Sequence, residues 1–525
     1  MKKLFLVSTS VIALGYASTA LAGSSSTYIT QTGSSQNATI TQTGADNGQV
    51  GTLGTPVQQG NGVGIGSNSM TITQTGSDNS SGVSGTTAQF GSSNTLSITQ
   101  SGNSSNANVL QIGTGGGSAA SRGLNNVIVD QSANNSNVNV TQTGKNNGNS
   151  GSNNAYGGPT DHTIAQSGGP ANAVTLNQTG NSNDFSIAQG GGSNNTLNVS
   201  ETGNSNAVVS DQSGSYLSVS GVQIGNWNYI DNYIDAGHGQ SGTHNALNVL
   251  QTGVFTSAAT RNVVHNQQSN NGNTANGTQV GNALTFSNTQ TGSNNIANST
   301  QLTQSSTVTS TQSGNTNSLT ANQISFAGSL TITSLQSGNN NDATSNQSGF
   351  LNVVMNTQSG DNGTANYTQS GTNNLATTVQ GGNNNTVNST QSGTNGTASY
   401  TQSGSFNVVT LQDQRGTGNH ITTDQSGAGT LGAPNLILAA QRGNSNGIEL
   451  TQGAGSGNTA YLAQGFSLIG AGPAYTIGGG GSVNNNTIQG SQSGSNNTVS
   501  AGQSSSSNVA SFNQNGNGNT AFIRQ

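Results

Sequence analysis

The sequence predicts an all-β fold, a repetitive β-solenoid of two-strand coils with about 22 residues per coil and amyloid-like stacking. Three observations lead to this prediction. Only 28% of the 525 residues are hydrophobic and 4% are charged, which leaves too little apolar surface for a conventional layered core. Glutamine recurs every eleven residues over long stretches. Between the glutamines, apolar and polar residues alternate as they do in β-strands.

The first 22 residues have the features of a secretory signal peptide. Lys2 and Lys3 supply the positive charge, residues 4–15 are largely apolar, and Ala20 and Ala22 form an A-x-A cleavage site. We expect cleavage after Ala22 and export of the mature chain, 23–525. No later stretch is long and apolar enough to span a membrane, so we expect no membrane span.

Glutamine sets the register of the repeat. The longest runs consist of Gln268, Gln279, Gln290, Gln301, Gln312 and Gln323, and then of Gln336, Gln347, Gln358, Gln369, Gln380, Gln391 and Gln402. Glycine follows two residues later, as in Gly292, Gly314, Gly338, Gly371 and Gly393. Asparagine often follows five residues after the glutamine, as in Asn273, Asn295, Asn317, Asn341, Asn374 and Asn385. These side chains are the predicted structural ladder and turn positions.

The spacing within one repeat predicts a strand and a turn. In residues 183–189, NDFSIAQ, the Asn, Phe, Ile and Gln lie two residues apart, so a β-strand places them on one face. A seven-residue strand and four turn residues account for the eleven. We expect the turn glycine to supply a positive φ.

Two architectures could hold this repeat. Between residues 268 and 323, asparagine occupies its position in alternate repeats, which favours a coil of about 22 residues with two unlike strands. A serpentine antiparallel sheet is the alternative, and it would set Gln opposite Asn on neighbouring strands. In the coil, Gln stacks on Gln, and stacked amides at the strand spacing can bond to one another along a ladder.

We expect residues 23–525 to form one continuous array. Its Gly-rich or irregular stretches are interpreted as loop insertions between coils, and they are residues 48–66, 113–123, 145–165, 427–434 and 465–483. The last repeat, 514–525, completes the motif at the final residue, so we expect growth by addition of further strands at the end.

Composition argues against most other functions. The sequence has no cysteine and no basic patch, which argues against thiolate metal sites and nucleic-acid binding. Fourteen acidic residues and five histidines are few for acid–base chemistry, so we predict no enzyme, no cofactor and no metal site. No histidine is placed by the repeat beside a carboxylate at ligand spacing, and we expect all five to be packed or solvated.

The repeat resembles that of a known family. Gln290, Gly292, Asn295, Ala297 and Gln301 fit the curlin repeat of bacterial curli fibre subunits, S-x5-Q-x-G-x2-N-x-A-x3-Q. Residues 336–347 and 514–525 fit it equally well, and the resemblance covers nearly all of 29–525.

The resemblance implies a function. Chains similar to curlin are exported by the Sec route, cross the outer membrane through a dedicated channel, and assemble with themselves and a curlin-like nucleator or other subunits. The products are extracellular amyloid fibres, a fimbrium that serves adhesion and biofilm matrix. The alternative is a non-polymerising solenoid adhesin that binds a glycan or a surface. Ice binding is disfavoured, because outward positions do not keep T-x-T in successive coils.

Overall fold

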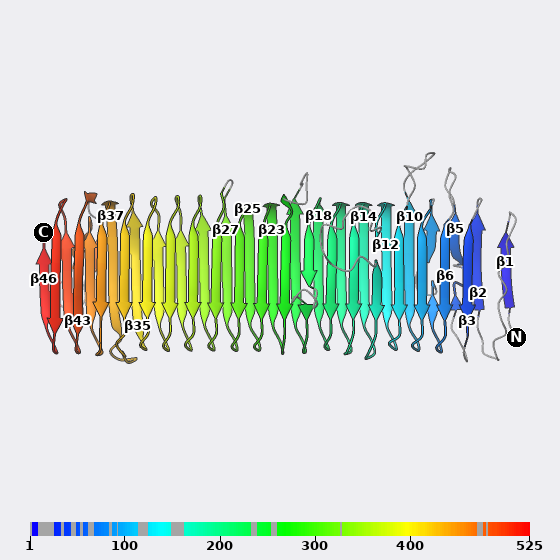
Figure 1. Cartoon of the computed structure of the whole chain (residues 1–525), viewed down its shortest axis with the longest axis horizontal. Coiled ribbons are helices and arrows are strands. Elements are labelled where there is room, and N and C mark those ends of the chain that lie inside the picture. The colour runs from blue at the N-terminus through cyan, green and yellow to red at the C-terminus, as the bar shows by residue number, and fades with distance from the viewer. Residues whose placement is uncertain are drawn as a thin grey trace. The chain divides into compact units, whose positions relative to one another are not determined.

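The computed structural model describes residues 3–8, 26–32, 36–43, 49–52, 56–60, 68–82, 87–91, 93–113, 124–148, 162–232, 239–253, 260–325, 328–469, 476–478 and 481–525. It divides into two compact units, unit 1 (Met1–Gly277) and unit 2 (Thr278–Gln525). Strands connected by turns make up the described residues, which contain no α-helix (Figure 1). The predicted all-β solenoid is confirmed in each unit.

Unit 1 contains two parallel sheets, here named sheets 1A and 1B. Sheet 1A contains β1 (Lys3–Ser8), β2 (Ser26–Thr32), β4 (Gln49–Val50), β5 (Val57–Gly60), β7 (Ser80–Ser81), β8 (Ala88–Phe90), β10 (Asn106–Gly113), β12 (Asn137–Lys145), β14 (Ala173–Asn181), β16 (Thr196–Asn204), β18 (Ser218–Gly225) and β21 (Ala246–Gly253). Sheet 1B contains β3 (Asn37–Gln42), β6 (Ser69–Gln74), β9 (Thr95–Gln100), β11 (Asn126–Gln131), β13 (Thr163–Gln166), β15 (Asp184–Gln189), β17 (Ala207–Gln212), β19 (Tyr229–Asn232), β20 (Gly239–Gln240) and β22 (Val263–Gln268). The boundary between the units falls within β23 (Thr274–Asn282).

Unit 2 has the same construction, with sheets 2A and 2B. Sheet 2A contains β25 (Ile296–Gln304), β27 (Ser318–Ile324), β29 (Asp342–Ser348), β31 (Thr364–Gln369), β33 (Thr386–Gln391), β35 (Asn407–Arg415), β37 (Asn435–Asn444), β39 (Thr459–Gln464), β42 (Val483–Asn484), β44 (Thr498–Gln503) and β46 (Thr520–Arg524). Sheet 2B contains β24 (Thr285–Gln290), β26 (Thr307–Gln312), β28 (Thr331–Gln336), β30 (Val353–Gln358), β32 (Leu375–Gln380), β34 (Thr397–Gln402), β36 (His420–Gln425), β38 (Gly447–Gln452), β43 (Thr487–Ser493) and β45 (Val509–Asn515). A hairpin of β40 (Ser467–Ile469) and β41 (Thr476–Gly478) stands outside both sheets.

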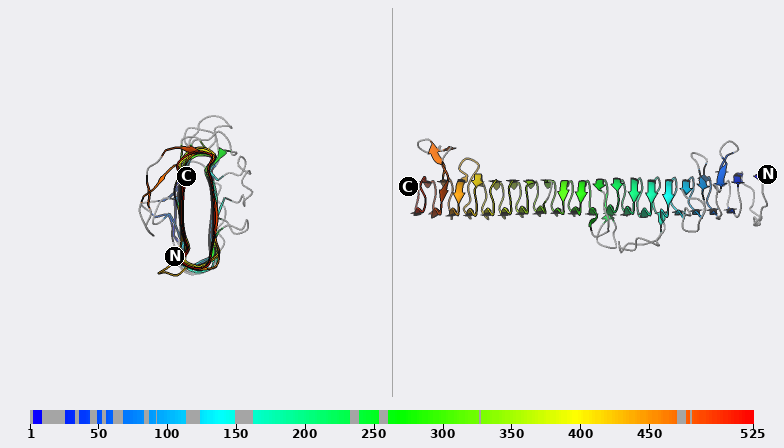
Figure 2. Two further views of the ribbon diagram at one scale, coloured as in Figure 1. Left: turned by 90° about the vertical axis from the view of Figure 1, so that its left-hand side faces the viewer. Right: turned by 90° about the horizontal axis from the view of Figure 1, so that it is seen from above.

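Within these sheets, strands pair in parallel with the strands one coil away. In sheet 2B, for example, β28 pairs with β30 from Thr331↔Val353 to Gln336↔Gln358. Figure 2 shows the two sheets as opposite walls of the coil. Glutamine therefore stacks on glutamine, and the serpentine antiparallel alternative is wrong.

The core lies between the two walls and follows the period of two. In β30, Val354, Asn356 and Gln358 are buried, whereas Met355 points outward and is 47% exposed. Tyr367, on the opposite sheet, is also buried, and its hydroxyl donates to Asn356 Oδ1 across the core at 3.2 Å. Burial raises the pKa of the Tyr367 phenol, so this hydroxyl stays a donor.

Six residues, one fewer than the seven expected, is the commonest strand length, as in β30 and β32, although other strands are longer, such as β25 with nine. Each of the six predicted asparagines lies immediately before a strand, such as Asn341 before β29 and Asn374 before β32. The residue before each asparagine is left-handed, with φ of 54° at Asn340 and 56° at Asn373. A left-handed residue cannot continue an extended ladder, so the strand begins only after the asparagine.

The turn glycines are required for a different reason from the one expected. Only Gly371, with φ of 93°, has a positive φ among the five predicted positions. A Cβ atom at Gly338 would overlap the carbonyl oxygen of Gly360 in the next coil. Corresponding overlaps occur at Gly292, Gly314, Gly371 and Gly393. Close stacking of turn on turn, rather than handedness, excludes a side chain here.

The sheets keep their register across inserted residues. Gln452 and Gln492 are 40 residues apart in the chain, yet they are register partners on β38 and β43. In β35 a register shift between Leu411 and Asp413 absorbs an extra residue, and the ladder resumes at Gln414. Extra residues between two strands, or a bulge within one, therefore do not change which residues pair.

The N-terminal segment forms a strand where a leader is predicted. Residues Lys3–Ser8 form β1, which pairs in parallel with β2. Ala20 and Ala22 lie outside the described residues, so cleavage after Ala22 stays a prediction. The described residues include no helix that is long and apolar enough to cross a membrane.

We predict that Gly338→Ala lowers the free energy of unfolding by about 1–3 kcal/mol, because its methyl group forces two stacked turns apart. The matched control is Gly447→Ala, since a Cβ atom there meets nothing within 4 Å and its φ is not positive. This control should stay within about 0.5 kcal/mol of the parent. Chemical denaturation followed by circular dichroism measures both, and equal midpoints would contradict the stacking explanation.

Candidate functional site: the buried amide ladders

The glutamines at the ends of the strands form continuous hydrogen-bonded columns, which we call glutamine ladders. In unit 2, each amide Nε2 donates to Oε1 of the next glutamine along the sheet at 2.7–3.1 Å. The ladder of sheet 2A contains Gln279, Gln301, Gln323, Gln347, Gln369 and Gln391, and continues through Gln414 to Gln525. The ladder of sheet 2B contains Gln290, Gln312, Gln336, Gln358, Gln380 and Gln402, and continues through Gln425 to Gln514.

Unit 1 has two ladders of the same kind. In sheet 1B the steps measure 2.7–3.3 Å and join Gln42, Gln74, Gln100, Gln131, Gln166, Gln189, Gln212, Gln240 and Gln268. In sheet 1A they join Gln31, Gln59, Gln89, Gln111, Gln142 and Gln178, and then reach Glu201. Sequence spacing between partners varies, but the donor always lies nearer the N-terminus.

Many of the glutamines, such as Gln358 and Gln380, also tie their strand to the opposite sheet. The second N–H of Gln380 donates to the backbone oxygen of Thr364 at 3.1 Å, and that of Gln358 to the backbone oxygen of Asp342 at 3.2 Å. Both donors and the acceptor of the amide are then used, so the amide is buried without an unmet polar group. The ladder therefore holds the coils together along the stack and closes each coil across the core.

The predicted asparagines are buried but do not form amide-to-amide ladders. Nδ2 of Asn317 donates to the oxygen of Gly338 at 2.7 Å, a backbone group of the next turn. Oδ1 of Asn317 accepts from the backbone N–H of Asn341 at 3.0 Å. Asn317 therefore bonds the backbone of the next turn, whereas the glutamines bond one another's side chains along the ladder.

The other predicted asparagines follow the same pattern with local variation. Nδ2 of Asn295, Asn341, Asn374 and Asn385 donates to the oxygens of Gly314, Gly360, Gly393 and Gly404 at 2.8–2.9 Å. In unit 1, Nδ2 of Asn273 donates to the oxygen of Ser269 at 2.7 Å, and the backbone N–H of Asn273 donates to Asn245 Oδ1 at 2.9 Å.

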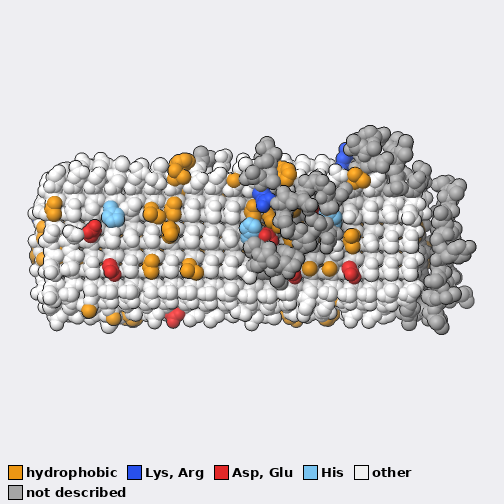
Figure 3. Space-filling model, viewed as in Figure 1, with side chains coloured by type: hydrophobic (Ala, Val, Ile, Leu, Met, Phe, Trp, Pro, Cys, Tyr) orange, Lys and Arg blue, Asp and Glu red, His pale blue; other side chains and the backbone are white. Residues whose placement is uncertain are grey.

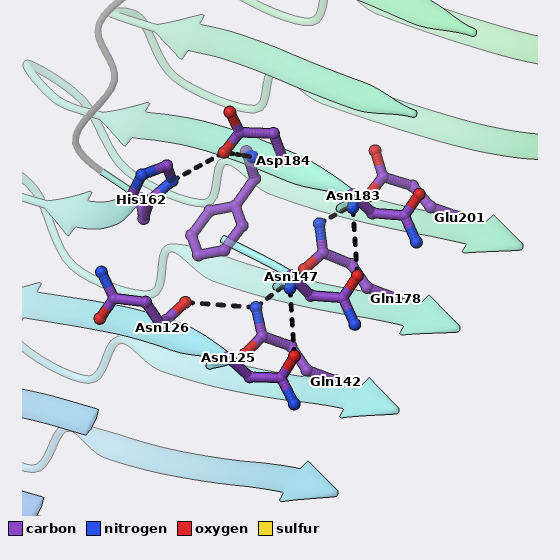
Figure 4. Close-up of polar contacts among 10 residues, drawn as sticks. Asn125, Asn126, Gln142, Asn147, His162, Gln178, Asn183, Asp184 and Glu201 are labelled. Carbon is purple, nitrogen blue, oxygen red and sulfur yellow. Dashed lines mark hydrogen bonds and ion pairs between the residues drawn. The ribbon is translucent and has the colours of Figure 1, made fainter. Parts of the chain in front are cut away.

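One ladder position carries an acid in place of the amide. Figure 4 shows Gln142, Gln178 and Glu201 in one column, with Asn125, Asn147 and Asn183 beside it. Glu201 is fully buried and Gln178 Nε2 donates to its Oε2 at 2.6 Å. Burial raises the pKa of Glu201 from 4.5 to about 8, the Gln178 hydrogen bond opposes this rise, and the charge of Asp184 adds to it.

Two histidines lie beside carboxylates, which differs from the sequence expectation. His265 Nδ1 is 2.8 Å from Asp231 Oδ2, and the two residues are register partners. His162 Nδ1 is 2.7 Å from Asp184 Oδ1. Asp231 and His265 are 34 residues apart in the chain, so the residues inserted between them hide the pairing from the repeat spacing. Over the described ranges, no group of three or more His, Asp or Glu side chains could hold a metal ion.

Sequence reasoning missed Glu201 and the ladder member Gln414. Glu201 lies 23 residues after Gln178 and 22 before Gln223, so its place in the register could have shown its role. Gln412 and Gln414 both lie near the expected position, and only the bulge in β35 selects Gln414. The arrangement as a whole is a repeating structural contact, in which every coil presents to the next the groups that it receives from the previous one.

Comparison with known proteins gives one family. The family model described as the curlin associated repeat matches residues 67–102 and 494–525. The first match includes β6 and β9 with their ladder residues Gln74 and Gln100, and the second includes β44 to β46. The curlin repeat is the structural repeat of extracellular curli fibre components. No curated protein matches the chain.

We expect Gln358→Leu to lower the free energy of unfolding by about 2–6 kcal/mol. The change leaves Gln336 without its acceptor and Gln380 without its donor, and each orphaned buried group costs about 1–3 kcal/mol. Gln489→Leu makes the same chemical change at an exposed amide, which donates to Glu449, and should shift stability by less than about 0.5 kcal/mol. Denaturation midpoints that fall equally for both variants would show that the ladder is not what stabilises the coils.

Proposed function

Because this chain carries curlin repeats, we propose that it is an exported structural protein whose coils assemble with those of other copies into extracellular fibres. The observation that supports this most directly is the identity of successive contacts. The steps from β28 to β30 and from β30 to β32 join the same backbone positions and the same glutamine, so a coil from a second chain can make the contacts that a coil of the same chain makes.

The near absence of charge favours such stacking. Like charges at the strand spacing of about 4.8 Å repel in water by roughly 0.9 kcal/mol per pair. Only 4% of the residues are charged, and on the face drawn in Figure 3 the charged side chains are few and scattered. Added coils therefore meet little accumulated repulsion.

The proposed export route, partners and role follow from the resemblance to the curlin-repeat family. We propose that residues 1–22 direct export by the Sec route and that the mature chain crosses an outer-membrane channel. Outside the cell it joins a curlin-like nucleator or further subunits and forms amyloid fibres that serve adhesion and biofilm matrix. Its amide ladders and close-packed turn glycines are the structural residues of those fibres.

We predict that purified 23–525 forms fibres that bind thioflavin T and give a fibre reflection near about 4.8 Å. In that polypeptide the last strand is β46, which pairs with β44. The oxygen of Asn519 accepts from Thr498, so the N–H of Thr520, on the opposite side of the same trans peptide, points away from β44. Thr520→Pro removes this donor from the outer edge and should slow fibre growth, whereas Thr520→Ala should not.

Electron micrographs and growth rates measure this outcome. A stable monomeric rod by light scattering, with no dye binding, would overturn the proposal and favour a non-polymerising adhesin. Equal growth of the two Thr520 variants would show that β46 does not take part in the growing edge.

A further inference from the structure

Glu201 interrupts a ladder that is otherwise built from amides. It lies on β16 in register with Gln178 on β14 and Gln223 on β18. Its side chain is 0% exposed, as are those of both partners. The ladder resumes beyond it, since Gln223 Nε2 donates to Gln251 Oε1 at 2.9 Å.

The step from Glu201 to Gln223 has no hydrogen-bond donor when Glu201 is ionised. On the other side, Gln178 Nε2 donates to Glu201 Oε2, in the same way as a glutamine Nε2 donates at the other ladder steps described above. Glu201 Oε1 and Gln223 Oε1 are both buried, and neither has a hydrogen-bond partner. A carboxylate only accepts hydrogen bonds, whereas a protonated carboxyl group donates one. A proton on Oε1 would let Glu201 donate to Gln223, as an amide does at the other positions.

Few ionisable groups surround this carboxyl group. The strands paired with β16, which are β14 and β18, carry no ionisable side chain. On the opposite sheet, β15 carries Asp184 and β17 carries Asp211. Asp184 is held by His162 at 2.7 Å, and the described groups that act on the Glu201 carboxyl are Gln178 and Asp184, neither of which is a cation. The surroundings therefore offer the ionised form one amide donor and no compensating positive charge.

We propose that Glu201 is a proton-controlled link in the glutamine ladder of sheet 1A, closed when the carboxyl group is protonated and open when it is ionised. With the proton in place, Glu201 imitates glutamine and the column is continuous. Without it, two buried acceptors meet and a charge lies in the core, so the stack is weakest between β14 and β18. This inference concerns the folded coils and holds whether or not the chain polymerises.

The sign of the pH effect follows from the raised pKa. The folded coil binds the proton more tightly than the unfolded chain does, so the stabilisation is complete below about pH 4.5. It is lost as the pH rises toward about 8, the pKa in the folded state. Acid conditions therefore keep this ladder closed and mildly alkaline conditions open it.

Infrared difference spectroscopy on chain 23–525 tests the protonation directly. Glu201→Gln is the test variant, and Glu449→Gln is its control, because these are the only two glutamates and Glu449 is exposed. We expect a protonated-carboxyl band near neutral pH that disappears with a midpoint around pH 8 and is absent from Glu201→Gln. The band should remain in Glu449→Gln. Its persistence in Glu201→Gln, or titration of Glu201 in the ordinary range near 4.5, would overturn the proposal.

Amide hydrogen exchange tests the mechanical consequence. After correction for intrinsic exchange, protection in β14, β16 and β18 should fall by up to about tenfold per pH unit between pH 6 and 8. The fall should be absent in Glu201→Gln, and β28 and β30 serve as an internal reference in both chains. An identical pH dependence in the two chains would contradict the proposal, and so would failure of Glu201→Gln to fold, since glutamine should fit this ladder.

Discussion

The hydrogen bond from one glutamine amide to the next is the contact on which the rest of the structure depends. The side chains of Gln336, Gln358 and Gln380 would each be costly to bury alone, and become acceptable only because an identical group lies one strand away. This requirement fixes the pairing as parallel and in register. It also explains why a chain with 28% hydrophobic residues can have an interior at all, since amides occupy positions that apolar side chains fill in most proteins.

Glutamine and asparagine make different contacts between the coils. Glutamine is long enough to reach its counterpart and the opposite sheet, as Gln358 does through Gln380 and Asp342. Asn317 instead bonds the backbone, and it fixes the turn of the next coil through Gly338. The turns can then stack so closely that a side chain at Gly338 would overlap the carbonyl oxygen of Gly360 in the next turn. One repeat thus specifies a core contact and a turn contact with separate residues.

Much of this could be predicted from sequence because the repeat is long and the strand period is simple. The alternation in residues 183–189 gave the buried face of β15, and the eleven-residue spacing of glutamine gave the two strands of each coil. The role of Gly338 could not be predicted, because it depends on how near the next carbonyl lies. The contact between Asp231 and His265 was hidden by inserted residues, which break the spacing without breaking the register. The backbone partners of the asparagines likewise depend on turn geometry that the spacing does not contain.

The register that β38 and β43 keep across 40 residues has a practical consequence. The position of a residue along the stack depends on how many coils precede it. The number of residues inserted at one turn therefore does not change the rise of about 4.8 Å from that coil to the next. A foreign peptide grafted into the hairpin of β40 and β41 would project sideways from a fixed height within unit 2. These coils could therefore display epitopes or enzymes at defined positions along the stack, and the position would be chosen by counting ladder glutamines.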